Sequence, residues 1–183
     1  MIILASASPQ RWALVGTLGV AYTIDMPEVE EGADPMANAR AKAAEVAGRR
    51  HLEPGEVVVA CDTEVVLDGR ALGKAGDEAQ AREMMTSLAG RAHEVVSALV
   101  VRGPAGAREA LVSTAVHMRA HEPALIEWYL GTGEWSGRAG SYAVQGAGGA
   151  LVERIDGDPS SVVGLPLPAL VSALRDLGMA PFA

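Results

Sequence analysis

The sequence predicts an α/β fold in which a mixed, largely antiparallel sheet is flanked by helices. β-type apolar runs intermix with segments of helical periodicity, without the strict alternation of a parallel α/β fold. Two long β-type runs, at residues 95–101 and 110–116, surround a turn signal at Gly103-Pro104 and favour a central hairpin. The length of 183 residues fits one domain, which we expect to span residues 1–183.

The first half of the chain carries clear signals for where its elements begin. Residues 2–5 form a short apolar run that we interpret as a buried strand. Pro9 suits the first turn of a helix that follows this strand. Asp34 before Pro35 predicts a second helix, because Asp is a favoured N-cap and proline is tolerated at the first helical position. Lys42 falls at the edge of the apolar stripe of that helix, within reach of a cleft beside the core.

The second half alternates between β-type runs and helical segments. Residues 57–60 and 65–67 are apolar β-type runs separated by residues 61–64, and Asp68-Gly69 is a hairpin turn signal. The remaining expected elements are a helix that Asp77 caps and Gly90 ends, a short helix over residues 123–130, a glycine-rich segment over residues 140–149, and a last amphipathic helix over residues 167–177.

Charge and cysteine content exclude several classes of protein. The formal net charge is −8, which argues against duplex DNA or RNA as a partner but not against a small phosphorylated ligand. Cys61 is the only cysteine, so no internal disulfide forms, as expected in a reducing compartment. The start of the chain does not resemble a signal peptide, and no apolar stretch approaches the ~20 residues of a membrane helix. We therefore expect a cytoplasmic protein that does not bind membranes.

The segment after the first strand is a candidate anion-binding site. Ser6, Ser8 and Arg11 surround the start of the expected helix, where hydroxyls, backbone N–H groups and a guanidinium suit a phosphate. The alternative is an ordinary serine-capped helix with a solvated arginine.

Two charged residues are further candidates. Asp62 lies between two apolar runs, where a carboxylate requires a metal, a cation or a catalytic role, or else is a turn residue that accepts backbone hydrogen bonds. Lys74 follows Leu72-Gly73, but the spacing is not that of a P-loop, so it is a phosphate contact or a solvated lysine.

Two other patterns have a structural as well as a functional interpretation. Gln145 offers a donor and an acceptor, which suits recognition of a base edge, whereas the glycines around it are those of a tight loop. The acidic run that ends at Glu31 is either a solvated surface or a helper for Asp62 in holding a hard metal ion.

Taken in order, these segments resemble the Maf family of nucleotide pyrophosphatases, nearly from end to end. The motifs that carry the resemblance are residues 4–11 (LASASPQR), 27–31 (PEVEE), 41–43 (AKA), 62–65 (DTEV), 72–74 (LGK), 88–95 (LAGRAHEV), 133–135 (GEW), 139–146 (AGSYAVQG) and 162–167 (VVGLPL). The resemblance implies a fold similar to that of inosine triphosphate pyrophosphatases, with a cleft between two lobes. It also implies hydrolysis of a nucleoside triphosphate to the monophosphate and pyrophosphate.

The resemblance also implies roles for individual residues. Asp62 matches the catalytic carboxylate that accepts a proton, and Glu31 matches an acidic residue near a Mg²⁺ or Mn²⁺ ion, which Asp62 also holds. The positions that match phosphate-side groups are Ser6, Ser8, Arg11, Lys42 and Lys74, and those that match substrate choice are Gln10, Thr63 and Gln145.

The closest branch by resemblance acts on dTTP and UTP, and a homodimer is expected from the resemblance alone. Two departures, Gln10 for the usual arginine and Arg138 for the usual lysine, change charge and geometry on the substrate side. The alternatives are a nucleotide-binding regulator of septum formation with little turnover and a phosphatase that releases orthophosphate.

Overall fold

The structure is a computed structural model of the chain and describes residues 1–179. Its elements follow in the order β1 (Ile2–Ala5), α1 (Pro9–Gly16), β2 (Tyr22–Ile24), α2 (Pro35–Gly48), β3 (Val57–Leu67), β4 (Arg70–Leu72), α3 (Glu78–Leu88), β5 (Ala92–Gly103), β6 (Gly106–Met118), α4 (Pro123–Gly131), a 3₁₀ helix η1 (Ala147–Leu151), β7 (Val152–Asp156), α5 (Pro159–Val163) and α6 (Leu167–Asp176).

The strands form one seven-stranded sheet in the order β2-β1-β3-β5-β6-β7, with β4 paired to β3. Strand β1 runs parallel to both β2 and β3, whereas β3 with β4 and β6 with β7 are antiparallel pairs. The α/β class and the mixed, mostly antiparallel sheet that the sequence predicts are therefore confirmed.

The chain forms two compact units. Among the described residues, unit 1 contains Met1–Asp62, Ser97–Val112 and residues 164–179, and unit 2 contains Thr63–Val96 and Ser113–Val163. Strands β3, β5 and β6 contribute residues to both units.

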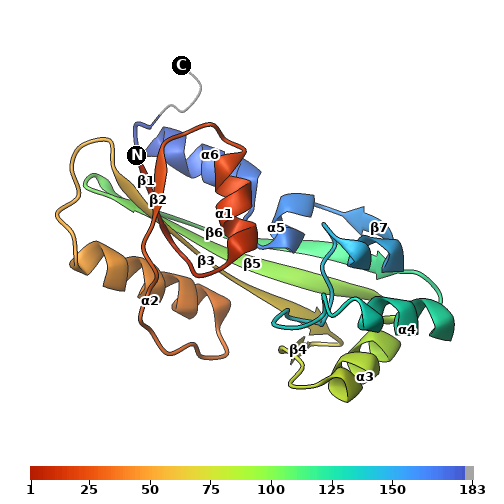
Figure 1. The fold of residues 1–183 in the computed structure, drawn as a ribbon. Helices are drawn as coiled ribbons and strands as arrows, with labels where there is room; N and C mark the ends of the chain where they lie inside the picture. The colour runs from red at the N-terminus through yellow and green to blue at the C-terminus, as the bar shows by residue number, and fades with distance from the viewer. Residues whose placement is uncertain (180–183) are drawn as a thin grey trace. The chain divides into compact units, whose positions relative to one another are not determined.

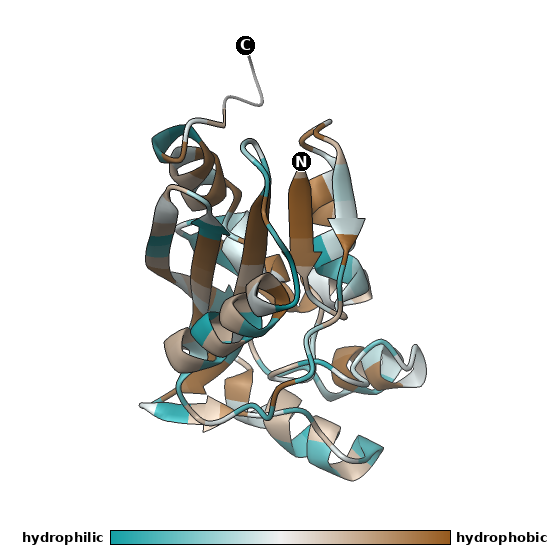
Figure 2. Cartoon of the chain, turned by 90° about the vertical axis from the view of Figure 1, so that its left-hand side faces the viewer, coloured by the Kyte–Doolittle hydropathy of each residue, from teal (hydrophilic) through white to brown (hydrophobic). Residues whose placement is uncertain are grey.

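Unit 1 has three layers because alternate side chains of its strands face opposite helices. Ile2 and Leu4 of β1 pack in a cluster with residues of α1 and α6, which include Val15, Leu170 and Leu174. Ile3 and Ala5 point the other way, into a cluster with Ala39, Ala43 and Val46 of α2. Figure 1 shows α2 on one face of these strands and α1 and α6 on the other. A strand covered on both faces is apolar throughout, and β1 is brown over most of its length in Figure 2.

Unit 2 has its own core, beneath helices α3 and α4. Met85 and Leu88 of α3 pack there with Ile126, Tyr129 and Leu130 of α4. Tyr129 is the largest of the fully buried side chains among the described residues. None of the helices within residues 1–179 is long and apolar enough to cross a lipid bilayer.

The local signals that the sequence carries are confirmed at three positions. The Asp34 side chain accepts hydrogen bonds from Met36 N at 2.8 Å and Ala37 N at 3.3 Å, as an N-cap does. Asp77 likewise accepts from Gln80 N at the start of α3. Asp68 and Gly69 have φ values of 51° and 75°, as a two-residue hairpin turn between β3 and β4 requires.

One expectation from the sequence is wrong in its details. The runs at residues 57–60 and 65–67 are not separate strands, because β3 continues without a break through residues 61–64. Asp62, Thr63 and Glu64 are partly buried rather than fully buried, so polar side chains are accommodated without ending the strand. Asp62 is therefore a residue inside a strand, and its interpretation as a turn or strand-end residue is wrong.

Candidate functional site

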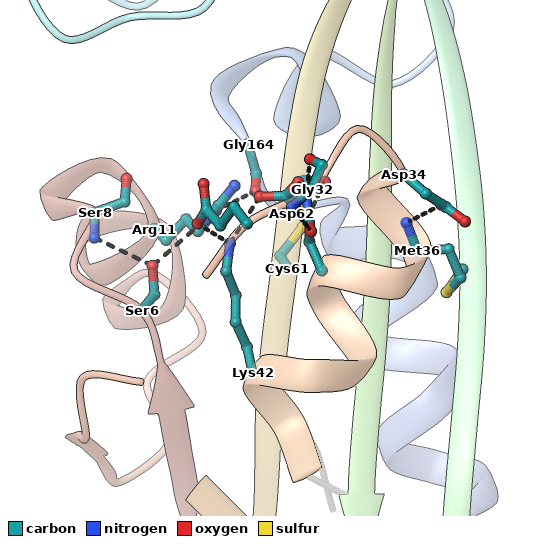
Figure 3. A network of polar contacts seen from close by, with 12 residues as sticks. Ser6, Ser8, Arg11, Gly32, Asp34, Met36, Lys42, Cys61, Asp62 and Gly164 are labelled. Atoms are coloured by element: carbon teal, nitrogen blue, oxygen red, sulfur yellow. Dashed lines mark hydrogen bonds and ion pairs between the residues drawn. The ribbon is translucent and has the colours of Figure 1, made fainter. Parts of the chain in front are cut away.

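Asp62 is the centre of a charged cluster in unit 1. Lys42 extends from α2 toward it, and Lys42 Nζ lies 2.7 Å from Asp62 Oδ1 (Figure 3). The same Nζ lies 2.5 Å from Glu31 Oε1, so one ammonium group joins both carboxylates. Lys42 is only 4% exposed, and its position one turn from Asn38 on the buried face of α2 explains why. The structure thus brings together three residues that the sequence singled out separately.

A fourth residue, Asn38, completes the cluster. Asn38 Nδ2 donates to Asp62 Oδ2 at 2.8 Å, so each oxygen of the Asp62 carboxylate has one partner from α2. Asn38 also exchanges two hydrogen bonds with the backbone of Gly32, which follows Glu31. The acidic segment is therefore tied to the same helix as Lys42.

The cluster contains two carboxylates, which are ligands suited to a hard divalent cation. The Asp62 and Glu31 side chains are 15% and 52% exposed, and both carboxylates converge on the positive charge of Lys42. Mg²⁺ is usually held by one or two carboxylates together with waters and substrate phosphates. Among residues 1–179 there is no group of three or more His, Cys, Asp or Glu side chains that would form a complete metal cage. The two carboxylates therefore fit an ion that shares its coordination with a phosphate.

The segment after β1 begins beside the part of β3 that contains Asp62. Strands β1 and β3 are parallel neighbours, and their pairing ends with Ala5 opposite Ala60. Ser6 directly follows this last pair on one strand, and Asp62 comes two residues after it on the other. Carboxyl ends of parallel strands are a common place for ligand sites in α/β proteins. The two motifs are far apart in the sequence, and the pairing of β1 with β3 places them at neighbouring positions.

The polar side chains of this segment are held in an ordered loop. Ser6 is buried, and its Oγ accepts from Ser8 N at 3.1 Å and from Arg11 Nη1 at 3.5 Å. Arg11 Nε donates to Gly164 O at 2.7 Å, which fixes the guanidinium (Figure 3). Ser8 is the N-cap residue of α1 but makes no side-chain cap, and its Oγ donates to Gln10 Oε1 at 2.9 Å instead. The ordinary serine-capped helix is therefore not what the structure contains.

The other candidate residues belong to unit 2. Lys74 is exposed, and its backbone pairs with Ala139, while Gly140 N donates to the carbonyls of Leu72 and Gly73. This pairing joins the Lys74 loop to the segment that leads to Gln145, which is also exposed. Thr63 directly follows Asp62 on β3. The roles of Thr63, Lys74 and Gln145 stay predictions.

The glycine-rich segment is shaped by close backbone contacts. Side chains at Gly148 and Gly149 would meet the backbone of Ala143 and Val144 at 2.7–2.8 Å. A Cβ at Gly146 would overlap the carboxylate of Glu134, which accepts from Ala147 N at 3.2 Å and Gly148 N at 2.9 Å. The interpretation of these glycines as tight-loop residues is confirmed.

A buried pair of aromatic rings anchors the same segment. His93 Nε2 lies 2.8 Å from Tyr142 OH, and the two rings meet edge to face. Burial lowers the pKa of His93 to about 4, with a smaller contribution from the charge of His117. Burial also raises the pKa of Tyr142. Both groups are therefore neutral near pH 7, and His93 has a structural role.

Asn38 and Glu134 are the polar residues that sequence reasoning missed. Asn38 looks like an ordinary polar residue at the start of a helix, and its only signal is its spacing of four from Lys42 on the apolar stripe. Glu134 lies in the motif at residues 133–135, but that motif does not indicate its contacts, because the N–H groups that it binds lie 13 and 14 residues later.

The chain is similar to known proteins along nearly its whole length. The model of the family described as Maf-like protein matches residues 1–177. The chain belongs to this family. Among the relatives of this Maf-like chain, the dTTP/UTP pyrophosphatase of Anaeromyxobacter sp. (strain Fw109-5) is 44% identical over 97% of this chain and 89% of its own length. The dTTP/UTP pyrophosphatase of Pyrococcus abyssi (strain GE5 / Orsay) is 38% identical over 99% and 98%. The Myxococcus xanthus (strain DK1622) protein of the same name is 37% identical over 98% and 93%.

Proposed function

We propose that this Maf-like protein is a nucleoside-triphosphate pyrophosphatase that converts its substrate to the monophosphate and pyrophosphate. The observation that carries the proposal is the cluster of Asp62, Lys42 and Glu31 near the carboxyl end of β1, where the serine and arginine loop begins. The names of relatives that match nearly the whole chain support the same reaction.

Asp62 is the group that activates water. Its carboxylate takes a proton from a water molecule as the water oxygen bonds to the α-phosphorus. The bond between this phosphorus and the bridging oxygen breaks, and pyrophosphate leaves with the electron pair. Lys42 beside Asp62 and Arg11 after β1 supply positive charge for the phosphate oxygens. Ser6 and Ser8 order the loop that presents Arg11.

A divalent ion is part of this proposal. When bound by Asp62 and Glu31, Mg²⁺ or Mn²⁺ would neutralise the charge that the phosphates carry. Lys42 forms an ion pair with each of the same two carboxylates, so the protein itself also supplies positive charge to both.

The substrate class that we propose is dTTP and UTP, following the names of the relatives. Gln10, Thr63 and Gln145 remain the residues that we expect to affect the choice of base, with Lys74 as a further phosphate contact. The cytoplasmic location and the homodimer remain predictions from the sequence and the resemblance.

Pyrophosphate release from a panel of canonical and modified triphosphates, with and without Mg²⁺, tests the proposal. We expect release of pyrophosphate rather than orthophosphate, and Asp62→Asn should reduce kcat by about 100-fold or more if proton transfer depends on it. Circular dichroism shows whether the variant keeps the fold. Near-normal turnover of folded Asp62→Asn would refute the role of Asp62, and saturable binding without any product would favour a nucleotide-binding regulator.

A further inference from the structure

We infer that Asn38 is a positioning residue that fixes the orientation of the Asp62 carboxylate. The inference rests on the proposed function, because it assigns Asn38 to the same reaction. It is carried by the contacts of one buried amide, which is 6% exposed.

The hydrogen bonds of Asn38 determine which way its amide points. Gly32 N donates to Asn38 Oδ1 at 2.7 Å, and Nδ2 donates to Gly32 O at 2.9 Å and to Asp62 Oδ2 at 2.8 Å. Both hydrogens of the amide are used. The reverse orientation would place a carbonyl oxygen against a carboxylate and against Gly32 O, and would leave Gly32 N facing a donor. One orientation therefore satisfies the whole network.

Asn38 and Lys42 act on Asp62 from the same helix face. They are four residues apart on α2, so their side chains lie one above the other. Asn38 holds Oδ2 while Lys42 holds Oδ1, and the two contacts together fix the plane of the carboxylate. An aspartate side chain has a broad rotational preference about its last bond, so a single contact would leave this plane less defined.

Asn38 lies beside an apolar cluster, so its buried amide needs hydrogen-bond partners. Its neighbours on the same stripe, Ala39, Ala43 and Val46, form an apolar cluster with the sheet. A buried amide in such a place is tolerated only when it is hydrogen-bonded, and asparagine is a weaker helix former than alanine. The bonds to Gly32 and Asp62 offset that cost, and the bond to Asp62 is the one that reaches the reacting group.

The isosteric variant Asn38→Asp separates the two roles. Its carboxylate still accepts from Gly32 N but donates nothing to Asp62, whereas Asn38→Ala removes every contact. We expect both variants to lower kcat for pyrophosphate release about 10- to 100-fold, since a misplaced catalytic group or a lost charged hydrogen bond has effects of this size. KM should change less than about threefold, because Asn38 affects the reacting carboxylate more than substrate binding.

Val46→Ala is the matched control on the same helix. Val46 is fully buried in the apolar cluster, so the variant lowers the melting temperature but should keep wild-type kcat well below that temperature. If Asn38→Asp and Asn38→Ala also keep wild-type kcat, Asn38 does not position Asp62. If only Asn38→Ala loses activity, the role of Asn38 is to anchor Gly32, and the inference is overturned.

A double-variant comparison provides a readout that does not depend on turnover. The losses in melting temperature of Asn38→Ala and Asp62→Ala should sum to more than the loss of the double variant, because both remove the same hydrogen bond. Additive losses would contradict the contact. If wild-type protein releases no pyrophosphate from any triphosphate, the proposed function fails, and this comparison still decides whether Asn38 holds Asp62.

Discussion

Acidification should destabilise the protein through His93. His93 is 3% exposed, its Nε2 faces Tyr142 OH, and its Nδ1 has no hydrogen-bond partner among residues 1–179. The protonated ring carries an N–H group on both nitrogens, so the one on Nδ1 would have no acceptor, and the charge would lie in the core of unit 2. The neutral ring is therefore the form that the folded chain accepts.

The size of this effect follows from the pKa of His93. Burial lowers that pKa from 6.5 to about 4, so the unfolded chain takes up a proton first. Stability is complete above pH 6.5, falls as the pH drops below it, and reaches its lower limit below pH 4. One pKa unit corresponds to about 1.4 kcal/mol, which gives a complete loss of about 3 kcal/mol. About 2 kcal/mol of this should be lost between about pH 7.5 and pH 5.

Urea unfolding followed by circular dichroism at a series of pH values measures the effect. His93→Gln is the comparison, because glutamine keeps a polar contact for Tyr142 but does not titrate. All other titrating groups are common to both proteins, so the difference between the two pH profiles isolates His93. Equal slopes for the wild type and His93→Gln between about pH 7.5 and pH 5 would refute the reasoning.

Two further substitutions test the charge balance and the glycine-rich segment. Lys42→Met should lower the free energy of unfolding by about 3 kcal/mol, because Asp62 and Glu31 lose their shared cation. Adding Asp62→Asn should recover part of that loss, and an unchanged urea midpoint in Lys42→Met would contradict the prediction. Gly146→Ala should cost about 1–3 kcal/mol in the same assay, because the new methyl group displaces the Glu134 carboxylate. Gly48→Ala, where a Cβ meets open space, should cause no loss, and equal losses in the two variants would count against the steric argument.

Most helices and turns of this chain were predictable because their signals are local. Asp34 and Asp77 cap their helices within three residues, and Asp68-Gly69 forms its turn through its own backbone preferences. The short strands β2 and β7 lacked such signals. A three-residue strand such as β2 has no measurable alternation, and it exists because β1 provides a partner.

The candidate site was predictable residue by residue but not as an arrangement. Asp62 and Lys42 each had a chemical reason to be singled out, and the resemblance to the family assigned them to one reaction. Their contact depends on α2 packing against the strands through Ala39, Ala43 and Val46, which aims the inner face of the helix at the middle of β3, where Asp62 lies. No spacing in the sequence encodes that distance.

The sequence by itself determined the fold class, the capped helices, the hairpin turn and the identity of the charged residues, because these follow from local preferences and from side-chain chemistry. Only the tertiary structure decided that β3 continues through Asp62, that Lys42 joins two carboxylates and that Asn38 holds the second oxygen of Asp62. Hydrogen bonds and ion pairs between residues 20 to 24 positions apart exist only after the helix has packed on the sheet.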